Sequence, residues 1–288
     1  MKKMILASIA FIAIGGFAFS VKEVEAKSFE KENSFEVGNI EEVEINNESW
    51  NIEVKNTKSQ KIKISVEGKQ KKKKDPVTIK NDGKKIVVNQ QDQEGGLMGG
   101  FTFGKKGTIY ISIPKNKIDK ITINNSFGDV KMNDIMAKNI VVLNDSGFEK
   151  IEGLYADSGK FTSKDGELTL KNSTFKKLTV ASTNGENYIA RVTSPKMKVT
   201  STDGEVSIKD IKEGKSLFVK TKSGDITVSY KEAPTSLLLT ARSDSSDITV
   251  DLDGFKEKMN TEKSKEGTIG NASNKLELVS KDGTININ

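Results

Sequence analysis

Two stretches of the chain, Ser182–Ile189 and Ser201–Ile208, carry nearly the same sequence, STNGENYI and STDGEVSI. Their glycines are 19 residues apart, and glycines recur in similar settings elsewhere in the chain. The recurring glycines are Gly128, Gly147, Gly166, Gly185, Gly204, Gly224 and Gly283. A repeat period near twenty residues is typical of solenoid architectures, in which each repeat stacks on its neighbours.

Apolar residues keep fixed distances from these glycines. Four residues after the glycine stand Met132, Ile151, Leu170, Ile189, Ile208, Val228 and Ile287. Five residues before it stand Ile123, Val142, Phe161, Val180, Val199, Val219 and Leu278. The residues between the apolar columns are mostly Thr, Lys, Ser and Asn. Such alternation indicates half-buried β-strands, because successive side chains of a strand point to opposite faces.

Each repeat therefore holds two short strands joined by a turn that contains glycine. Turn dipeptides such as Asn184-Gly185 and Asp203-Gly204 would suggest hairpins in isolation, with glycine supplying a positive φ. A coil that winds onto the previous coil explains the column identity better, because each column then stacks on itself. We therefore predict an all-β chain with a parallel β-helix, or β-solenoid, of about 19-residue coils, each roughly 60 Å around at 3.3 Å per residue.

A polar column accompanies the apolar ones, three residues before the glycine. Its members are Asn125, Asn144, Ser163, Ser182, Ser201, Thr221, Ser243 and Ser280. Because they share the parity of the apolar columns, we expect them to form a ladder beside the turn. Their amides and hydroxyls can hydrogen-bond along the stack or to the turn backbone.

Some residues break the pattern. Glu149, Asn187 and Gly159 occupy apolar slots, and we expect their coils to be locally shifted. Between Ser246 and Gly283 the register is lost, and Gly267–Ile269 is interpreted as a degenerate coil.

The N-terminus predicts export. Two lysines precede an apolar run from Met4 to Phe19, which is short for a membrane span of about 20 residues and typical of a signal-peptide core. Residues 1–26 are therefore predicted to be a signal peptide or an N-terminal membrane anchor. Residues 27–117 are predicted to be a β-rich capping region with a Gly-rich loop at 90–107, and residues 118–288 to be the solenoid repeats.

Composition excludes several kinds of chemistry. The chain has no cysteine and no histidine, which excludes disulfides, thiol nucleophiles, His-based triads and the usual zinc sites. Its charge of +6 comes almost wholly from lysines scattered among acids, with Arg191 and Arg242 as the only arginines. We therefore expect no nucleic-acid binding. The run Lys71–Lys74 is interpreted as a solvated loop, and Phe101 and Phe103 as loop packing.

One acidic column is a candidate for catalysis or Ca²⁺ binding. It follows the turn glycine and contains Asp129, Glu167, Glu186, Glu205, Asp225 and Asp247. Glycoside chemistry needs convergent carboxylates, whereas this column continues the repeat without a break. It also lacks the spacing of calcium-binding nonapeptide repeats. We therefore interpret it as a solvated face beside the turns, and assign no catalytic, cofactor-binding or metal-binding residue and no cofactor.

The segment TIYISIPKNKIDKITINNSFGDVKM, Thr108 to Met132, resembles the bacterial putative-adhesin β-strand-repeat family. The resemblance extends over roughly residues 40–288 and includes LiaG-like proteins of Gram-positive envelope-stress operons. It implies an exported or membrane-anchored protein, and the family defines no catalytic residues that could be carried over.

We therefore predict a non-enzymatic, extracytoplasmic β-solenoid at the cell envelope, with surface binding like that of an adhesin or an association with envelope stress. The expected partner is an envelope polymer or a surface protein, and membrane contact is expected only through the N-terminal segment. The alternative is a polysaccharide-acting β-helix enzyme, a lyase or a hydrolase, because parallel β-helices also host such enzymes.

Overall fold

The computed structural model describes residues 27–38, 40–70, 75–91, 107–115, 118–245 and 247–288. The predicted signal or anchor segment, the lysine run 71–74, Phe101, Phe103 and most of the Gly-rich loop lie outside these residues. Within the described part of the chain, no helix has the length and apolar character needed to cross a membrane.

Two long sheets contain the strands of the described residues. The first sheet has 12 strands, in the spatial order β1 (Lys27–Glu36), β4 (Lys61–Gln70), β7 (Gly107–Pro114), β3 (Asn51–Thr57), β9 (Val130–Asn133), β11 (Glu149–Glu152), β13 (Leu168–Lys171), β15 (Asn187–Ala190), β17 (Val206–Ile211), β19 (Ile226–Tyr230), β25 (Ile285–Ile287) and β21 (Ile248–Val250). The second has 13 strands, in the order β22 (Lys256–Thr261), β23 (Ser264–Ile269), β20 (Leu237–Ser243), β24 (Asn274–Ser280), β18 (Ser216–Lys220), β16 (Lys196–Thr200), β14 (Thr174–Ser182), β12 (Tyr155–Ser163), β10 (Met136–Asn144), β8 (Ile118–Asn125), β2 (Glu42–Asn47), β6 (Lys85–Gln90) and β5 (Val77–Asn81).

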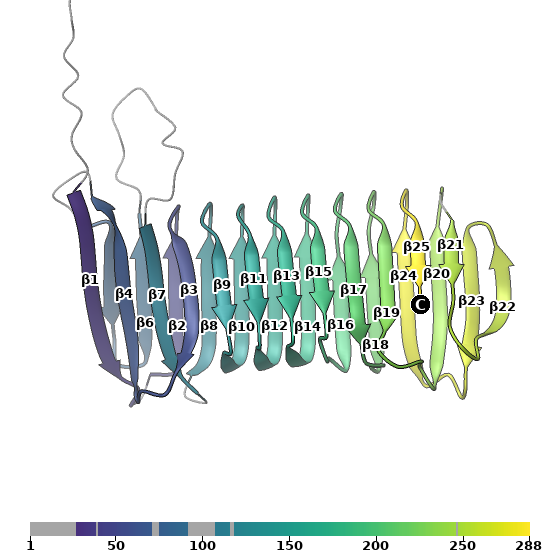
Figure 1. Cartoon of the computed structure of the whole chain (residues 1–288), viewed down its shortest axis with the longest axis horizontal. Helices are drawn as coiled ribbons and strands as arrows, with labels where there is room; N and C mark the ends of the chain where they lie inside the picture. The colour runs from purple at the N-terminus through teal and green to yellow at the C-terminus, as the bar shows by residue number, and fades with distance from the viewer. Residues whose placement is uncertain (1–26, 39, 71–74, 92–106, 116–117, 246) are drawn as a thin grey trace, which may run out of the picture.

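From β8/β9 to β18/β19 each repeat contributes one strand to each sheet, and successive repeats pair in parallel (Figure 1). Val199 pairs with Val180 on one side and with Val219 on the other, so the apolar columns lie on top of themselves. The inward side chains of both sheets form one core, in which Val199 and Ile208 are fully buried. The predicted parallel β-solenoid is therefore confirmed.

The turn glycines are required for a different reason from the one predicted. Among the seven glycines of the column, Gly147 has a positive φ, of 117°, and the other six do not. A Cβ atom at Gly185 would lie 1.8 Å from the carbonyl oxygen of Gly166, and one at Gly204 would lie 2.0 Å from that of Gly185. Close stacking of one turn on the next, and not a left-handed backbone, excludes larger residues here.

The polar column forms the predicted ladder beside the turns. Asn125 donates a 2.6 Å hydrogen bond to the side-chain oxygen of Asn144 in the next coil. Asn144, Ser163 and Thr221 each donate to the carbonyl of the turn glycine three residues later, at 2.6–2.9 Å. The ladder therefore satisfies turn carbonyls that would otherwise be buried without a partner.

Glu149 and Asn187 do not shift their coils, contrary to our expectation. Glu149 pairs in register with Val130 and Leu168, and Asn187 pairs with Leu168 and Val206. Both side chains are buried in the apolar core, at 1% and 2% exposure. Backbone pairing with two neighbouring coils holds both strands in register, although this buries the polar side chains of Glu149 and Asn187.

Gly159 also stays in register. It pairs with Ile140 and Leu178, and the rings of Phe161 and Phe175 occupy the space where its side chain would lie. A Cβ atom at Gly159 would come within 2.6 Å of the Phe175 ring. The missing side chain is thus compensated by two aromatic rings, and no shift of the strand is needed.

At both ends of the stack the coils depart from sequence order. The coil of β2 and β3 lies between β6/β7 and β8/β9, and the coil of β24 and β25 lies between β18/β19 and β20/β21 (Figure 1). The interpretation of Gly267–Ile269 as a degenerate coil is wrong, because β23 pairs antiparallel with β20 and β22. The boundary that we predict between residues 117 and 118 stays a prediction.

Antiparallel strands lie at the N-terminal end of both sheets and at the C-terminal end of the 13-stranded sheet. At the N-terminal end β4 pairs antiparallel with β1 and β7, and β5 pairs antiparallel with β6. The buried ring of Trp50 lies against Gly68 and Gly107, where a Cβ atom would come within 2.5 Å of it. These strands cover parallel edges of the repeats, which limits edge-to-edge association, whereas the 12-stranded sheet ends in β21, which pairs in parallel with β25.

Candidate functional site

The acidic column lies along the row of turns that joins the two sheets. Asp129 accepts a hydrogen bond from the backbone N–H of Phe148 at 3.2 Å, and Asp225 accepts one from Thr284 at 2.7 Å. In both cases the donor belongs to the next coil of the stack. Among the described residues, no group of three or more acidic side chains is placed to hold a metal ion. These two contacts join neighbouring turns of the stack.

A polar hollow of about 310 Å³ opens at the N-terminal end of the 13-stranded sheet. Its carboxamide side chains are Asn46, Asn47, Asn89, Gln90, Gln91, Asn124 and Asn125. The remaining lining comes from Glu48, Ser126, Leu143 and Asp145. Carboxamides can donate and accept hydrogen bonds at the same time, so this lining can bind hydroxyl or amide groups.

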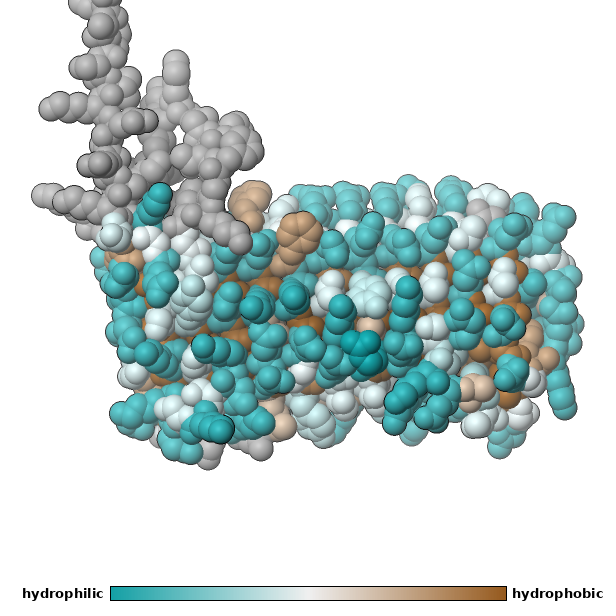
Figure 2. Space-filling view, in the orientation of Figure 1, coloured by the Kyte–Doolittle hydropathy of each residue, from teal (hydrophilic) through white to brown (hydrophobic). Residues whose placement is uncertain are grey.

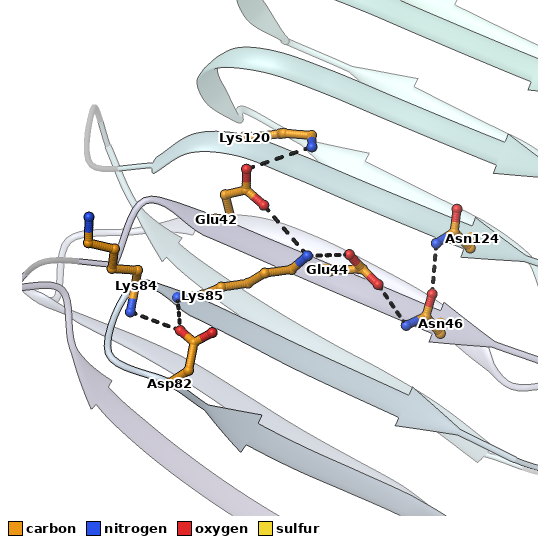
Figure 3. A network of polar contacts seen from close by, with 8 residues as sticks. All are labelled: Glu42, Glu44, Asn46, Asp82, Lys84, Lys85, Lys120 and Asn124. Carbon is orange, nitrogen blue, oxygen red and sulfur yellow. Dashed lines mark hydrogen bonds and ion pairs between the residues drawn. The ribbon is translucent and has the colours of Figure 1, made fainter.

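An outer row of amides crosses three strands on the solvent side of the sheet. Asn124 donates to the side-chain oxygen of Asn46 at 2.7 Å, and Asn46 donates to that of Asn89 at 2.9 Å (Figure 3 shows the first of these contacts). All three side chains are partly exposed. The shared bonds fix the orientation of the row, which leaves the Asn124 oxygen and the Asn89 nitrogen at its two ends.

An inner row of amides lies directly behind the outer row. Asn47 donates to Asn125 at 2.5 Å and to the carbonyl of Trp50 at 2.6 Å, and both Asn side chains are buried. Gln90 accepts hydrogen bonds from the backbone N–H groups of Glu48 and Ser49, both at 2.9 Å. This row supports the turns, whereas the outer row is the part of the hollow that faces solvent.

Ion pairs flank the outer row. Lys85 contacts Glu44 at 2.6 Å and Glu42 at 3.6 Å, and Lys120 contacts Glu42 at 3.6 Å (Figure 3). The hydrogen bond from Lys85, followed by that from Asn46, lowers the pKa of Glu44, and Glu44 in turn raises the pKa of Lys85. Glu44 therefore stays ionised and holds the Asn46 amide at 3.0 Å.

Two exposed phenylalanines lie on turns beside the hollow. Phe127 follows the lining residue Ser126 and is 71% exposed, and Phe148 lies in the next turn and is 62% exposed. Figure 2 shows apolar side chains that project from the rim of turns above a largely hydrophilic face. The two rings therefore add exposed apolar surface beside the hollow.

Our reasoning from the sequence did not identify this hollow. Its residues come from four separate segments, and Asn46 and Asn124 are 78 residues apart in the chain. A signal exists in retrospect: Ile45-Asn46-Asn47 and Ile123-Asn124-Asn125 share one sequence, and Val88-Asn89-Gln90 is close to it. The three tripeptides pair in register, which places their middle residues in one row.

The sequence profile of the family described as Toastrack DUF4097 matches residues 40–288. No curated protein matches the chain.

Solved structures with a similar fold are known. A putative adhesin from Bacteroides fragilis NCTC 9343 is 13% identical, with a TM-score of 0.56, and the alignment covers 90% of this chain and 97% of that one. A putative lipid binding protein from Parabacteroides distasonis ATCC 8503 is 11% identical, with a TM-score of 0.47 and coverages of 90% and 96%. A putative adhesin from Parabacteroides merdae ATCC 43184 is 12% identical, with a TM-score of 0.44 and coverages of 90% and 96%. At such identities the Bacteroides fragilis structure shows a shared fold and nothing about the ligand.

Proposed function

Since this chain belongs to the Toastrack DUF4097 family, we propose that it is a non-enzymatic, extracytoplasmic binding protein of the bacterial cell envelope. The structure from Bacteroides fragilis that shares the fold is named a putative adhesin, which supports binding as the general class of function. The apolar run Met4–Phe19 after two lysines supports export.

The hollow with its outer amide row carries the proposal about the ligand. Carboxamides match the paired donors and acceptors of sugar hydroxyls, and the exposed rings of Phe127 and Phe148 can pack against the apolar face of a sugar ring. The ligand is therefore a neutral segment of an envelope polysaccharide.

Binding is tested with purified wall polysaccharide and the full chain. Replacing both Asn124 and Phe127 by alanine removes one end of the amide row and one aromatic contact, so we expect affinity to fall about tenfold or more. The matched control replaces Asn139, exposed on β10 of the same sheet, and Tyr155, which is 51% exposed on β12. Equal binding by all three proteins, or no binding by the parent, would rule out the hollow as the site.

The same incubation tests the enzymatic alternative. A non-enzymatic protein releases no shorter fragments and no unsaturated products from the polysaccharide, with or without Ca²⁺. Turnover that disappears when Glu186 or Glu205 is replaced by glutamine would instead support a hydrolase or lyase.

Location and regulation are tested in cells. Protease added to intact cells should degrade residues 28–288, and full protection would contradict an extracytoplasmic location.

The association with envelope stress, which the resemblance to LiaG-like proteins implies, predicts increased transcription of the gene when wall synthesis is inhibited.

A further inference from the structure

Exposed lysines gather on the outer face of the 13-stranded sheet, away from the hollow. They lie on the adjacent strands β12, β14, β16 and β18, in the middle of the solenoid (Figure 1). The five lysines are Lys160, Lys177, Lys196, Lys198 and Lys220, and all are exposed. We call this set the lysine face.

The lysine face lacks counter-charges. The sequences of β14, β16 and β18 contain no aspartate or glutamate, and Asp157 on β12 is held by Lys176 at 2.7 Å. Across the described ranges, no acidic group lies within ion-pair distance of the five lysines. By contrast, Lys85 and Lys120 at the N-terminal end of the same sheet contact Glu42 and Glu44.

The register of the strands brings the positive charges close together. Lys177 pairs directly with Lys196 on the neighbouring strand, and adjacent strands are about 4.8 Å apart. Like charges that are directly opposite one another in a sheet are destabilising. A bound anion would relieve this repulsion, whereas the free protein has to bear it.

Hydroxyl groups lie between the ammonium groups. Thr179 pairs with Lys198, Thr200 pairs with Lys220, and Ser216 pairs with Lys196. Lys198 is further positioned over the ring of Phe218, with its nitrogen 5.7 Å from the ring centre. Lysine acts as a point charge toward phosphate, and neighbouring hydroxyls add hydrogen bonds to the other phosphate oxygens.

We propose that the lysine face is a docking surface for a linear polymer that carries phosphate groups, separate from the hollow. Charge complementarity selects the anion. A linear polymer fits this surface better than an anionic bilayer for two reasons. The five lysines are clustered on four adjacent strands, and among the described residues of those strands the only exposed large apolar side chain that could enter a lipid layer is Tyr155, at the start of β12.

Linear inorganic polyphosphate of defined length is the probe, and the full chain is the protein. Replacing Lys177, Lys196 and Lys198 by glutamine should lower the affinity at least about tenfold at low ionic strength. The slope of log affinity against log salt should become shallower by about 2, at roughly 0.7 per lost phosphate contact. The matched control replaces Lys131, Lys150 and Lys209, which are exposed on the 12-stranded sheet, and changes the net charge by the same amount.

A loss of affinity confined to the first variant supports the proposal, provided that the thermal midpoint of this variant is not below that of the parent. Equal losses in both variants would show attraction by net charge alone and overturn it, as would a parent that does not bind polyphosphate.

Vesicles of phosphatidylglycerol and phosphatidylcholine form the second arm. The N-terminal segment is common to all variants, so only the difference between variant and parent counts. If the protein binds vesicles through the three lysines and does not bind polyphosphate, the proposed polymer ligand is wrong and the lysine face binds a bilayer. The variant with Asn124 and Phe127 replaced should retain polyphosphate binding, so this proposal and the proposed polysaccharide site can fail separately.

Discussion

Replacing Glu149 by leucine should remove a large pH dependence from the stability of the protein. Glu149 points into the core from β11, between Val130 and Leu168, and is 1% exposed. Neither of its carboxylate oxygens has a hydrogen-bond partner. Burial raises the pKa of Glu149 to about 8, and the neighbouring Asn144 amide, which is already bonded to the carbonyl of Gly147, offsets only a part of this rise.

The size of the effect follows from proton linkage. In the unfolded chain the carboxyl has its ordinary pKa of 4.5, so between pH 4.5 and about 8 the folded protein binds one more proton than the unfolded chain. The contribution of this group is therefore fully present below pH 4.5 and is lost as the pH rises through about 8. At about 1.4 kcal/mol per pH unit, the loss is on the order of 3–5 kcal/mol.

Urea unfolding at several pH values between 5 and 8 measures this loss. The free energy of unfolding of the parent should fall with rising pH, whereas the Glu149→Leu protein should have a much flatter profile and should be more stable than the parent at pH 8. Glu186→Gln removes a carboxyl group at an exposed turn position, and as the control it should follow the parent. Parallel profiles for the parent and Glu149→Leu would refute the assignment of the pH dependence to this carboxyl.

Three further predictions concern the stack. Val199→Asp places an unpaired carboxylate in the core and should cost several kcal/mol in thermal or urea unfolding, whereas Lys198→Asp on the outer face should change stability by about 0.5 kcal/mol or less. Deleting Gly185–Asp203, one whole period, should leave a higher melting temperature than deleting half of it, because every column stays in register; equal melting temperatures would contradict the stacking. Gly224→Ala should lower the melting temperature by several degrees, since its Cβ would lie 2.2 Å from the Gly204 carbonyl oxygen, and an unchanged melting temperature would contradict the close stacking of turns.

The sequence by itself determined the repeating part of the fold. Apolar residues at fixed distances from each glycine predicted which side chains are buried, and the column from Asn125 to Ser280 predicted the ladder at the turns. These features are local to one coil and are repeated in the next. In a parallel stack, residues that are one period apart in the sequence lie side by side in space. The period alone was therefore sufficient to predict these features.

The candidate site was not predictable in the same way. The outer amide row combines Asn46, Asn89 and Asn124, which lie in coils that are out of sequence order. A period of 19 residues does not say that Asn46 pairs with a residue 78 positions later. Only the shared Ile-Asn-Asn sequences offered a signal, and they gain meaning once β2 is known to pair with β8.

The ends of the solenoid were decided by tertiary structure. The last coil, β24 with β25, pairs on both sides and separates β18/β19 from β20/β21, and the hairpin of β22 and β23 covers the edge of β20 at the end of the 13-stranded sheet. Every coil offers nearly the same backbone edge, so the order of coils depends on which arrangement covers the open ends and fills the core. The same strand pairing holds Glu149 in its buried slot, because the hydrogen bonds of two neighbouring coils fix the register for the whole strand, whatever one side chain prefers.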